Sequence, residues 1–424
     1  MTVHARTIPV LAEKDVVGQL RSLRAKQPVD FWAFYSSQLN GIVTDPSLMV
    51  LPFDDHIVHR GHGIFDTAAI VGGKIYDVDA HLDRFIKSAE RSKLKLPCSR
   101  EEMRDIIVQT AAASGRRDGS IRYWLSSGPG SLELTPAKSS EPGFFVMIFG
   151  GLSYPERWYT EGVRVMTTTY PIKAPLYAIT KATNYLPNVL MQMEAKEKGF
   201  DNGVFIDENG NVGESSNMNV AFVTSGGVLL HPKFDHILSG CTSLRLLELA
   251  RANQQRAGVA GVEVRDITVA EARASREMLQ LGSSIKVAPV VQWDDQVIGD
   301  GKPGPVSKAL LELLEEDMRS SDRLISIPYR LFDSDVYPFD RPARPRNTRM
   351  ARFTRIMSSS ASFPTRLCSF DFATVVILSI MRWLPTLRPF CFVGSKGNRM
   401  SGASSTCVVN GDTVIDAVPS NASS

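Results

Sequence analysis

Two short polar clusters carry residue types that do chemistry in combination. The first is Ile-Thr-Lys181-Ala-Thr-Asn-Tyr185, and the second is Gly213-Glu214-Ser-Ser-Asn-Met-Asn219. A lysine amine can form a Schiff base with an aldehyde, and a carboxylate that faces a pyridine nitrogen keeps this nitrogen protonated as an electron sink. A lysine by itself is most often a solvated surface residue, so the combination of Lys181 with Glu214 is what predicts a pyridoxal phosphate enzyme.

The segments around these clusters indicate how each side chain is positioned. Tyr170-Pro-Ile-Lys-Ala-Pro-Leu-Tyr177 contains two prolines, which predicts an extended loop that delivers Lys181 to the start of a helix from Asn184 to Lys198. Tyr185 follows Lys181 by four residues, one helical turn, so both side chains are expected on one face. The stretch Asp207-Glu-Asn-Gly210 predicts a tight hairpin turn that places Glu214 at the far end of the return strand.

A third motif predicts an anion site. Leu238-Ser-Gly-Cys-Thr242 precedes the amphipathic run from Leu244 to Ala250. Thr242 is therefore expected to cap a helix whose free N–H groups bind phosphate. Most capped helices bind no ligand, so this motif gains weight only beside the other two.

The chain divides into two expected domains and two flanking segments. We expect an N-terminal extension (1–30) with a helix over Glu13–Arg24, a small α/β domain (31–150), a linker (151–160), a larger domain (161–329) and a tail (330–424). In the small domain, the pattern predicts a hairpin at Val71–Tyr76, one helix over Asp79–Leu94, and strands over Ser120–Ser127 and Gly143–Phe149. In the larger domain, it predicts strands over Val163–Thr169, Asn202–Ile206, Asn219–Phe222 and Gly227–Leu230, and helices at Asn184, Leu244 and Ser307.

Composition is ordinary for a globular protein of 424 residues, with 43% hydrophobic and 22% charged residues. The net charge of +3 comes from the tail, where twelve Lys/Arg stand against six Asp, so the rest of the chain is slightly acidic and lacks the basic stripe of a nucleic-acid-binding protein. Neither a membrane span nor a disulfide or zinc pattern is expected. The tail is rich in Ser, Pro and Arg and is expected to be disordered.

Several motifs in the same order resemble the fold-type IV pyridoxal phosphate enzymes, and within them the plant-type D-amino-acid aminotransferase-like and branched-chain aminotransferase-like proteins. The resemblance covers about Phe31 to Pro328. Its motifs are Met49-Val-Leu-Pro-Phe-Asp-Asp-His56, His59-Arg-Gly-His-Gly-Ile-Phe-Asp-Thr67, Ile121-Arg-Tyr-Trp-Leu-Ser-Ser-Gly-Pro-Gly130 and Asn184-Tyr-Leu-Pro-Asn-Val-Leu190. It implies an α+β fold of two domains, the second larger and β-rich, and pyridoxal 5′-phosphate as cofactor.

The resemblance also implies roles for individual residues. Lys181 is the catalytic amine, and Tyr185 hydrogen-bonds the phenolic oxygen of the cofactor. Glu214 faces the ring nitrogen, with Asn219 ranked below it. The phosphate ligands are expected to be Arg84, the backbone at Cys241, Thr242 and Ser283. From spacing alone, Arg84 reads as a surface ion pair with Asp83 or Glu90, and only the resemblance reverses this preference.

Substrate contacts follow by the same comparison: Phe65, Thr67, Arg122 and Ser284. The loop Gly128-Pro-Gly-Ser-Leu-Glu-Leu-Thr-Pro136 lacks the arginine and histidine with which bacterial D-specific relatives hold the substrate carboxylate. Arg122 is expected to receive a carboxylate instead. D-Alanine with a 2-oxo acid acceptor is the favoured substrate pair, and branched-chain L-amino acids are an alternative.

A lyase on the same scaffold, releasing 4-aminobenzoate from aminodeoxychorismate, shares every cofactor contact. Thr67 matches a threonine that such lyases use, so the sequence leaves this reading open. An equally good explanation of Thr67 is that it is simply a β-branched residue of a strand.

Two further readings were weighed. His56, His59 and His62 recur every third residue, which suits a metal site on a helix face, but Gly61 and Gly63 interrupt a helix, so no metal is expected. A non-catalytic scaffold is disfavoured because lysine, glutamate, tyrosine and both arginines are all present. The resemblance implies a homodimer, and the expected compartment is the cytoplasm or a plastid, with no clear targeting peptide.

Overall fold

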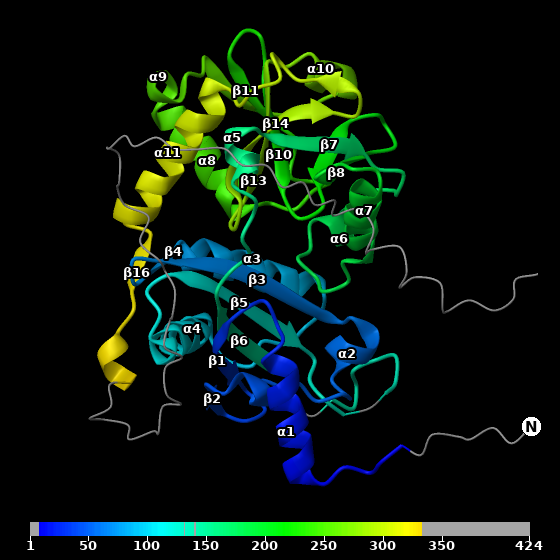
Figure 1. Ribbon diagram of the computed structural model, residues 1–424, viewed down its shortest axis with the longest axis vertical. Coiled ribbons are helices and arrows are strands. Elements are labelled where there is room, and N and C mark those ends of the chain that lie inside the picture. Colours follow the sequence, from blue (N-terminus) through cyan, green and yellow to red (C-terminus); the bar gives the residue numbers. More distant parts are fainter. Residues whose placement is uncertain (1–7, 131, 140, 333–424) are drawn as a thin grey trace, which may run out of the picture. The chain divides into compact units, whose positions relative to one another are not determined.

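The chain folds around two β-sheets in the computed structural model, which describes residues 8–130, 132–139 and 141–332 (Figure 1). The first sheet has seven strands in the order β16-β4-β3-β5-β6-β1-β2. The second has nine strands, ordered β12-β11-β10-β13-β14-β7-β8-β9, with β15 paired to β14. Both sheets lie within one compact unit of the chain.

The described elements have the following bounds. The first sheet consists of β1 Phe31–Ser36, β2 Gly41–Val43, β3 Gly63–Val71, β4 Lys74–Tyr76, β5 Gly119–Ser126, β6 Gly143–Phe149 and β16 Leu324–Ser326. The second consists of β7 Val163–Thr167, β8 Asn202–Ile206, β9 Val212–Ser215, β10 Asn219–Val223, β11 Val228–His231, β12 Gly261–Val264, β13 Glu277–Gly282, β14 Lys286–Trp293 and β15 Gln296–Val297. The helices are α1 Glu13–Arg24, α2 His56–Arg60, α3 Val78–Arg91, α4 Arg100–Ser114, α5 Arg157–Thr160, α6 Pro175–Ala178, α7 Leu186–Glu197, α8 Cys241–Ala252, α9 Gln254–Ala257, α10 Val269–Arg273 and α11 Pro305–Ser320, with 3-10 turns η1 Pro46–Leu48 and η2 Tyr329–Phe332.

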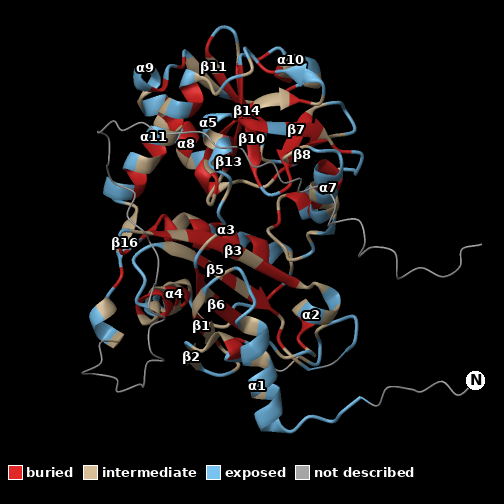
Figure 2. Cartoon of the chain, in the orientation of Figure 1, coloured by how far each residue is buried: buried red, intermediate tan, exposed pale blue. Residues whose placement is uncertain are grey.

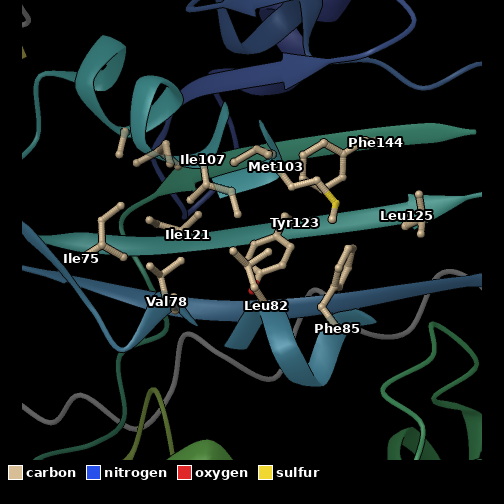
Figure 3. Close-up of a cluster of buried hydrophobic side chains, with 14 of the residues drawn as sticks. Ile75, Val78, Leu82, Phe85, Met103, Ile107, Ile121, Tyr123, Leu125 and Phe144 are labelled. Atoms are coloured by element: carbon tan, nitrogen blue, oxygen red, sulfur yellow. The ribbon is translucent and has the colours of Figure 1, made fainter. Parts of the chain in front are cut away.

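Strand alternation gives the first sheet two different faces. Successive side chains of a strand point to opposite faces. On one face, Ile121 and Tyr123 of β5 pack against Leu82 and Phe85 of α3, and the core extends to residues of α4 (Figure 3). Residues at the alternate positions of β3 and β5, among them Arg122, are left to the opposite face, where they line a cavity.

The second sheet is buried on both faces. Helices α8 and α11 supply Leu246, Leu247, Leu310 and Leu314 to the core on one face. A separate core cluster of the second sheet is built around Trp293, which is fully buried. Figure 2 shows the resulting contrast between the buried central strands and helix α1, which has no buried residue.

Most expected elements are present. The helix at 13–24, the strands β6 and β8 and the turn after Ile206 lie where the pattern predicts them. The hairpin between β3 and β4 turns through Gly72 and Gly73, whose φ values of 57° and 83° suit a two-residue hairpin turn.

Two helices of the small domain were missed, since the pattern gave a single helix there and the structure has α2 and α4 besides α3. Ser99 caps α4: its side chain accepts from the backbone N–H of Glu102, and the Glu102 side chain accepts from the backbone N–H of Ser99. This capping box was the available sequence signal, because Ser-x-x-Glu before a helical run is its signature.

The C-terminal boundary differs from the expected continuous domain over 161–329. Strand β16 pairs antiparallel with β4, so the chain returns to the first sheet after α11. Ile327 is buried in the core of that sheet. The expected linker over 151–160 also contains helix α5, which forms its last four residues.

No helix in the described part of the chain is long and apolar enough to span a membrane. We expected the tail over 330–424 to be disordered, and from residue 333 onward it lies outside the described part of the chain.

Candidate active site

The predicted site residues converge on one cavity of about 260 Å³. It is lined from β3 and β5 of the first sheet, from β9, β10 and the start of α8, and from the turn between β13 and β14. All twelve residues predicted for the site line it: Phe65, Thr67, Arg84, Arg122, Lys181, Tyr185, Glu214, Asn219, Cys241, Thr242, Ser283 and Ser284.

Lys181 is held by strand-like pairing. The backbone N–H of Phe65 donates to the Lys181 carbonyl at 3.0 Å, and the neighbouring Ala182 bridges to Ile64. Lys181 Nζ lies 3.3 Å from the Tyr185 hydroxyl. The two side chains therefore meet as predicted, but not through a shared helical face, because α7 begins only at Leu186.

Burial tunes both side chains. Loss of solvent, together with the nearby Arg84 guanidinium, lowers the pKa of Lys181 to about 8. Burial raises the pKa of Tyr185 to about 12, which keeps its phenol protonated at neutral pH. A lysine with a lowered pKa is a nucleophile near neutral pH.

Glu214 stands on the return strand of the hairpin, as expected. Its Oε2 accepts from Asn219 Nδ2 at 3.2 Å and from the Leu238 backbone N–H at 3.3 Å. Burial raises the pKa of Glu214 to about 7, and the positive charge of Lys173 is the largest opposing influence. Asn219 opens strand β10 and orients the carboxylate, so it is more than a turn residue.

The predicted anion site lies at the start of α8, but Thr242 is not the residue that caps this helix. Gly240 occupies the N-cap position and no side chain caps the helix, so Thr242 lies inside the first turn. Its hydroxyl contacts the Ser283 hydroxyl at 3.3 Å. The free N–H groups and the positive helix end favour an anion at this point.

Arg84 is not in a surface ion pair with Asp83 or Glu90. It is buried and forms an ion pair with Asp66, whose side chain has no exposed surface. Asp66 was missed by the sequence analysis. The available signal was strand alternation, since Asp66 is an acid at a core-facing position between Ile64 and Ala68.

Arg122 is the second cation at the cavity. Its Nε donates to Thr67 Oγ1 at 3.0 Å, and its guanidinium lies 5.3 Å from the centre of the Phe65 ring. No carboxylate in the described residues forms an ion pair with Arg122. Burial lowers its pKa. A buried guanidinium without a counterion can receive a carboxylate.

Two residues of the expected linker over 151–160 also line the cavity. Leu152 and Tyr154 line it beside Asn217 and Met218. An irregular segment carries no periodicity, so no sequence signal announced this role.

His56 and His62 contact each other and backbone carbonyls. His56 and His62 face each other, with their Nδ1 atoms 3.0 Å apart, while their Nε2 atoms contact the carbonyls of Glu133 and Ser92. Among the described residues, no group of three or more His, Cys, Asp or Glu side chains is arranged to hold a metal ion. Helix α2 ends at Arg60, followed by Gly61 in the left-handed region.

Comparisons with known proteins agree with this geometry. Residues 63–293 match the model of the amino-transferase class IV family. The D-amino-acid transaminase, chloroplastic, of Arabidopsis thaliana is 46% identical over 325 residues, which cover 76% of this chain and 86% of that protein.

Solved structures of low identity share the fold. The branched-chain amino acid aminotransferase of Escherichia coli aligns with a TM-score of 0.65 and 20% identity over 70% of this chain and 100% of its own. The 4-amino-4-deoxychorismate lyase of Pseudomonas aeruginosa aligns with a TM-score of 0.57 and 23% identity. This alignment covers 68% of this chain and 100% of the lyase chain. These likenesses confirm the expected α+β fold. The chain belongs to the class IV aminotransferase family, whose members are pyridoxal phosphate-dependent enzymes.

Proposed function

We propose that this chain holds pyridoxal 5′-phosphate in the cavity through Lys181 and transfers an amino group between a D-amino acid, such as D-alanine, and a 2-oxo acid. The observation that carries the proposal is the convergence of a lysine of lowered pKa, a buried carboxylate and the N-terminal end of helix α8 on one cavity. This donor set fits an aldehyde, a pyridine nitrogen and a phosphate.

Each part of the cofactor has a matching group on the chain. The backbone N–H of Cys241 would bind the phosphate, together with the hydroxyls of Thr242 and Ser283 and the guanidinium of Arg84, all of which line the cavity. Glu214, held by Asn219, would face the ring nitrogen. When bound, the cofactor supplies an electron sink for the bonding electrons at the substrate Cα.

The chain itself supplies proton transfer and substrate orientation. Lys181 Nζ is the group that removes the Cα proton and returns it, because its pKa of about 8 lies close to neutral pH. The Tyr185 hydroxyl, 3.3 Å away, orients this amine. Phe65 and Ser284 complete the substrate wall.

The carboxylate of the amino acid is proposed to bind Arg122. The guanidinium is already oriented by the Thr67 hydroxyl and stacked near Phe65, so little conformational freedom is lost on binding. This contact holds a carboxylate but does not by itself select the stereochemistry at Cα. The D-amino-acid part of the proposal rests on the likeness to the Arabidopsis enzyme.

A substitution of Lys181 tests the cofactor part. We expect Lys181→Ala to abolish both the visible absorbance of lysine-bound cofactor and turnover, since one amine serves as nucleophile and as acid/base. Lys196→Ala is the matched control, because it removes an exposed amine of helix α7 that does not line the cavity, and it should leave the lysine-bound absorbance in place. Turnover retained by Lys181→Ala would exclude the assignment.

The substrate is tested on the unmodified chain with three compounds offered separately. Formation of pyruvate from D-alanine with a 2-oxo acid acceptor is the expected result. Turnover of L-leucine alone would make the enzyme a branched-chain aminotransferase. Release of 4-aminobenzoate from aminodeoxychorismate alone would make it a lyase, a reading that the position of Thr67 in the cavity keeps open.

A homodimer is part of the proposal. Phe53, Val58 and Leu134 are 83%, 55% and 80% exposed, and a partner subunit that covered them would remove this apolar surface from water. Sedimentation of the purified chain would measure its mass in solution. The compartment is proposed to be the plastid rather than the cytoplasm, which the name of the Arabidopsis relative supports.

A further inference from the structure

Asp66 does not line the cavity, but its carboxylate contacts two basic side chains, those of Arg84 and His81. Its Oδ2 accepts from Arg84 Nε at 2.9 Å, and its Oδ1 accepts from Arg84 Nη2 at 2.7 Å. Oδ1 also accepts from the backbone N–H of Thr67 and contacts His81 Nδ1 at 2.8 Å. Asp66 therefore joins strand β3 to two cations of helix α3.

The charges of this cluster follow from its contacts. The two cations hold the pKa of Asp66 well below its usual range despite complete burial. Burial lowers the pKa of His81, but the Cys241 thiol and the Asp66 carboxylate together raise it to about 10. His81 and Arg84 are thus held in their charged forms between the Asp66 carboxylate and the Cys241 thiol, whose pKa they lower.

The geometry determines which part of Arg84 stays available. A guanidinium has five N–H donors. Asp66 occupies the edge formed by Nε and Nη2, and the Ser239 carbonyl accepts one N–H of Nη1 at 3.1 Å. One N–H on each terminal nitrogen remains, and Arg84 is among the residues lining the cavity near the start of α8.

We propose that Asp66 is the positioning residue of the phosphate site, and that His81 supports it as a second cation. Asp66 fixes the Arg84 guanidinium so that its remaining two N–H groups present a fork to a phosphate at the start of α8. A planar fork of this kind matches two oxygens of a phosphate. The inference rests on the proposed function, because it assumes that the cavity takes a phosphate-bearing cofactor.

The test compares two ligands that differ only in the phosphate group. Cofactor-free protein of full length is titrated with pyridoxal 5′-phosphate and with pyridoxal, and lysine-bound absorbance is measured. For Asp66→Asn, we expect affinity for pyridoxal 5′-phosphate to fall on the order of 10- to 100-fold, because Arg84 loses its charged partner. Affinity for pyridoxal should stay within about threefold, the scale of a few tenths of a kcal/mol.

A matched control removes a carboxylate on helix α3, next to Arg84. Asp83 precedes Arg84 directly, but its side chain is 56% exposed and pairs with Arg100. We expect Asp83→Asn to leave the affinities for both ligands unchanged. An equal loss of both ligands in Asp66→Asn would show a merely structural role and overturn the proposal, as would no loss of either.

A second variant keeps the test decisive if Asp66→Asn does not fold. In His81→Asn, an amide N–H can still reach Asp66 while the positive charge is removed. We expect a selective loss of pyridoxal 5′-phosphate affinity, smaller than that of Asp66→Asn. Equal or absent losses for the two ligands would contradict the proposal. If the unsubstituted chain binds neither ligand, the proposed function itself fails, which is a distinguishable result.

Discussion

Burial sets the chemistry of individual residues in the cavity, and it acts in opposite directions on the two signs of charge. It lowers the pKa of Lys181 to about 8 and raises the pKa of Glu214 to about 7. Both changes move an ionisable group toward neutral pH. Lys181 thereby becomes a usable base, and Glu214 depends on neighbours such as Lys173 to remain charged.

The pH dependence of cofactor capture tests this tuning of Lys181. Only the unprotonated amine attacks an aldehyde, so the capture rate of cofactor-free protein should rise with pH and level off above about 8. Stopped-flow absorbance between pH 6 and 10 would measure it. A rate that keeps rising up to pH 10 would instead indicate a lysine of ordinary pKa.

At the scale of secondary-structure elements, the N-cap residue of helix α8, Gly240, lies close to the first residue of strand β10, Asn219. The missing side chain of Gly240 allows this close approach. A Cβ added at Gly240 would lie 2.2 Å from Asn219 Oδ1 and 3.2 Å from Ser243 Oγ. Asn219 in turn donates to Glu214. The start of the helix and the orientation of the catalytic-site carboxylate are therefore coupled through one amide.

Gly240→Ala is expected to displace the Asn219 amide, lower turnover and reduce the free energy of unfolding by about 1–3 kcal/mol, the usual cost of overpacking. Urea denaturation and an activity assay would measure both effects. The control is Gly18→Ala, where an added Cβ on helix α1 meets nothing within 4 Å. It should leave turnover unchanged. Parent-like behaviour of Gly240→Ala would contradict the coupling.

At the scale of the whole molecule, the segment after helix α11 returns from the second sheet to the first. Strand β16 follows α11 but pairs with β4, and Ile327 packs in the core of the first sheet. Tyr76 of β4 also donates to Asp317 of α11 at 2.5 Å. Residues distant in sequence thus tie the first sheet to the helix that covers the second.

Ile327→Ala should lower the free energy of unfolding by about 2–5 kcal/mol, because it deletes buried methyl groups and leaves a cavity. Chemical denaturation would give this value. Ile8→Ala makes the same substitution at a residue that is 85% exposed and should change stability by less than about 0.5 kcal/mol. Equal effects at the two positions would show that the packing of Ile327, just after β16, contributes little.

Local patterns in the sequence were sufficient for several features. Hairpin turns, strand alternation and the helix at Glu13–Arg24 depend on residues within a few positions of one another, and the structure agrees with them. The chemistry of Lys181 and Glu214 was likewise predictable, since it depends on residue type. Resemblance to a family, rather than pattern, supplied Arg84 and Ser283.

Only the tertiary structure decided which distant groups meet. Arg84 bonds to the carbonyl of Ser239, 155 residues away, and its ion pair with Asp66 exists because α3 packs on β3. The return of β16 and the contribution of Tyr154 to the cavity are contacts of the same long-range kind. A local pattern reports burial and turn geometry, whereas pairing between distant segments depends on the packing of the complete chain, which no local window contains.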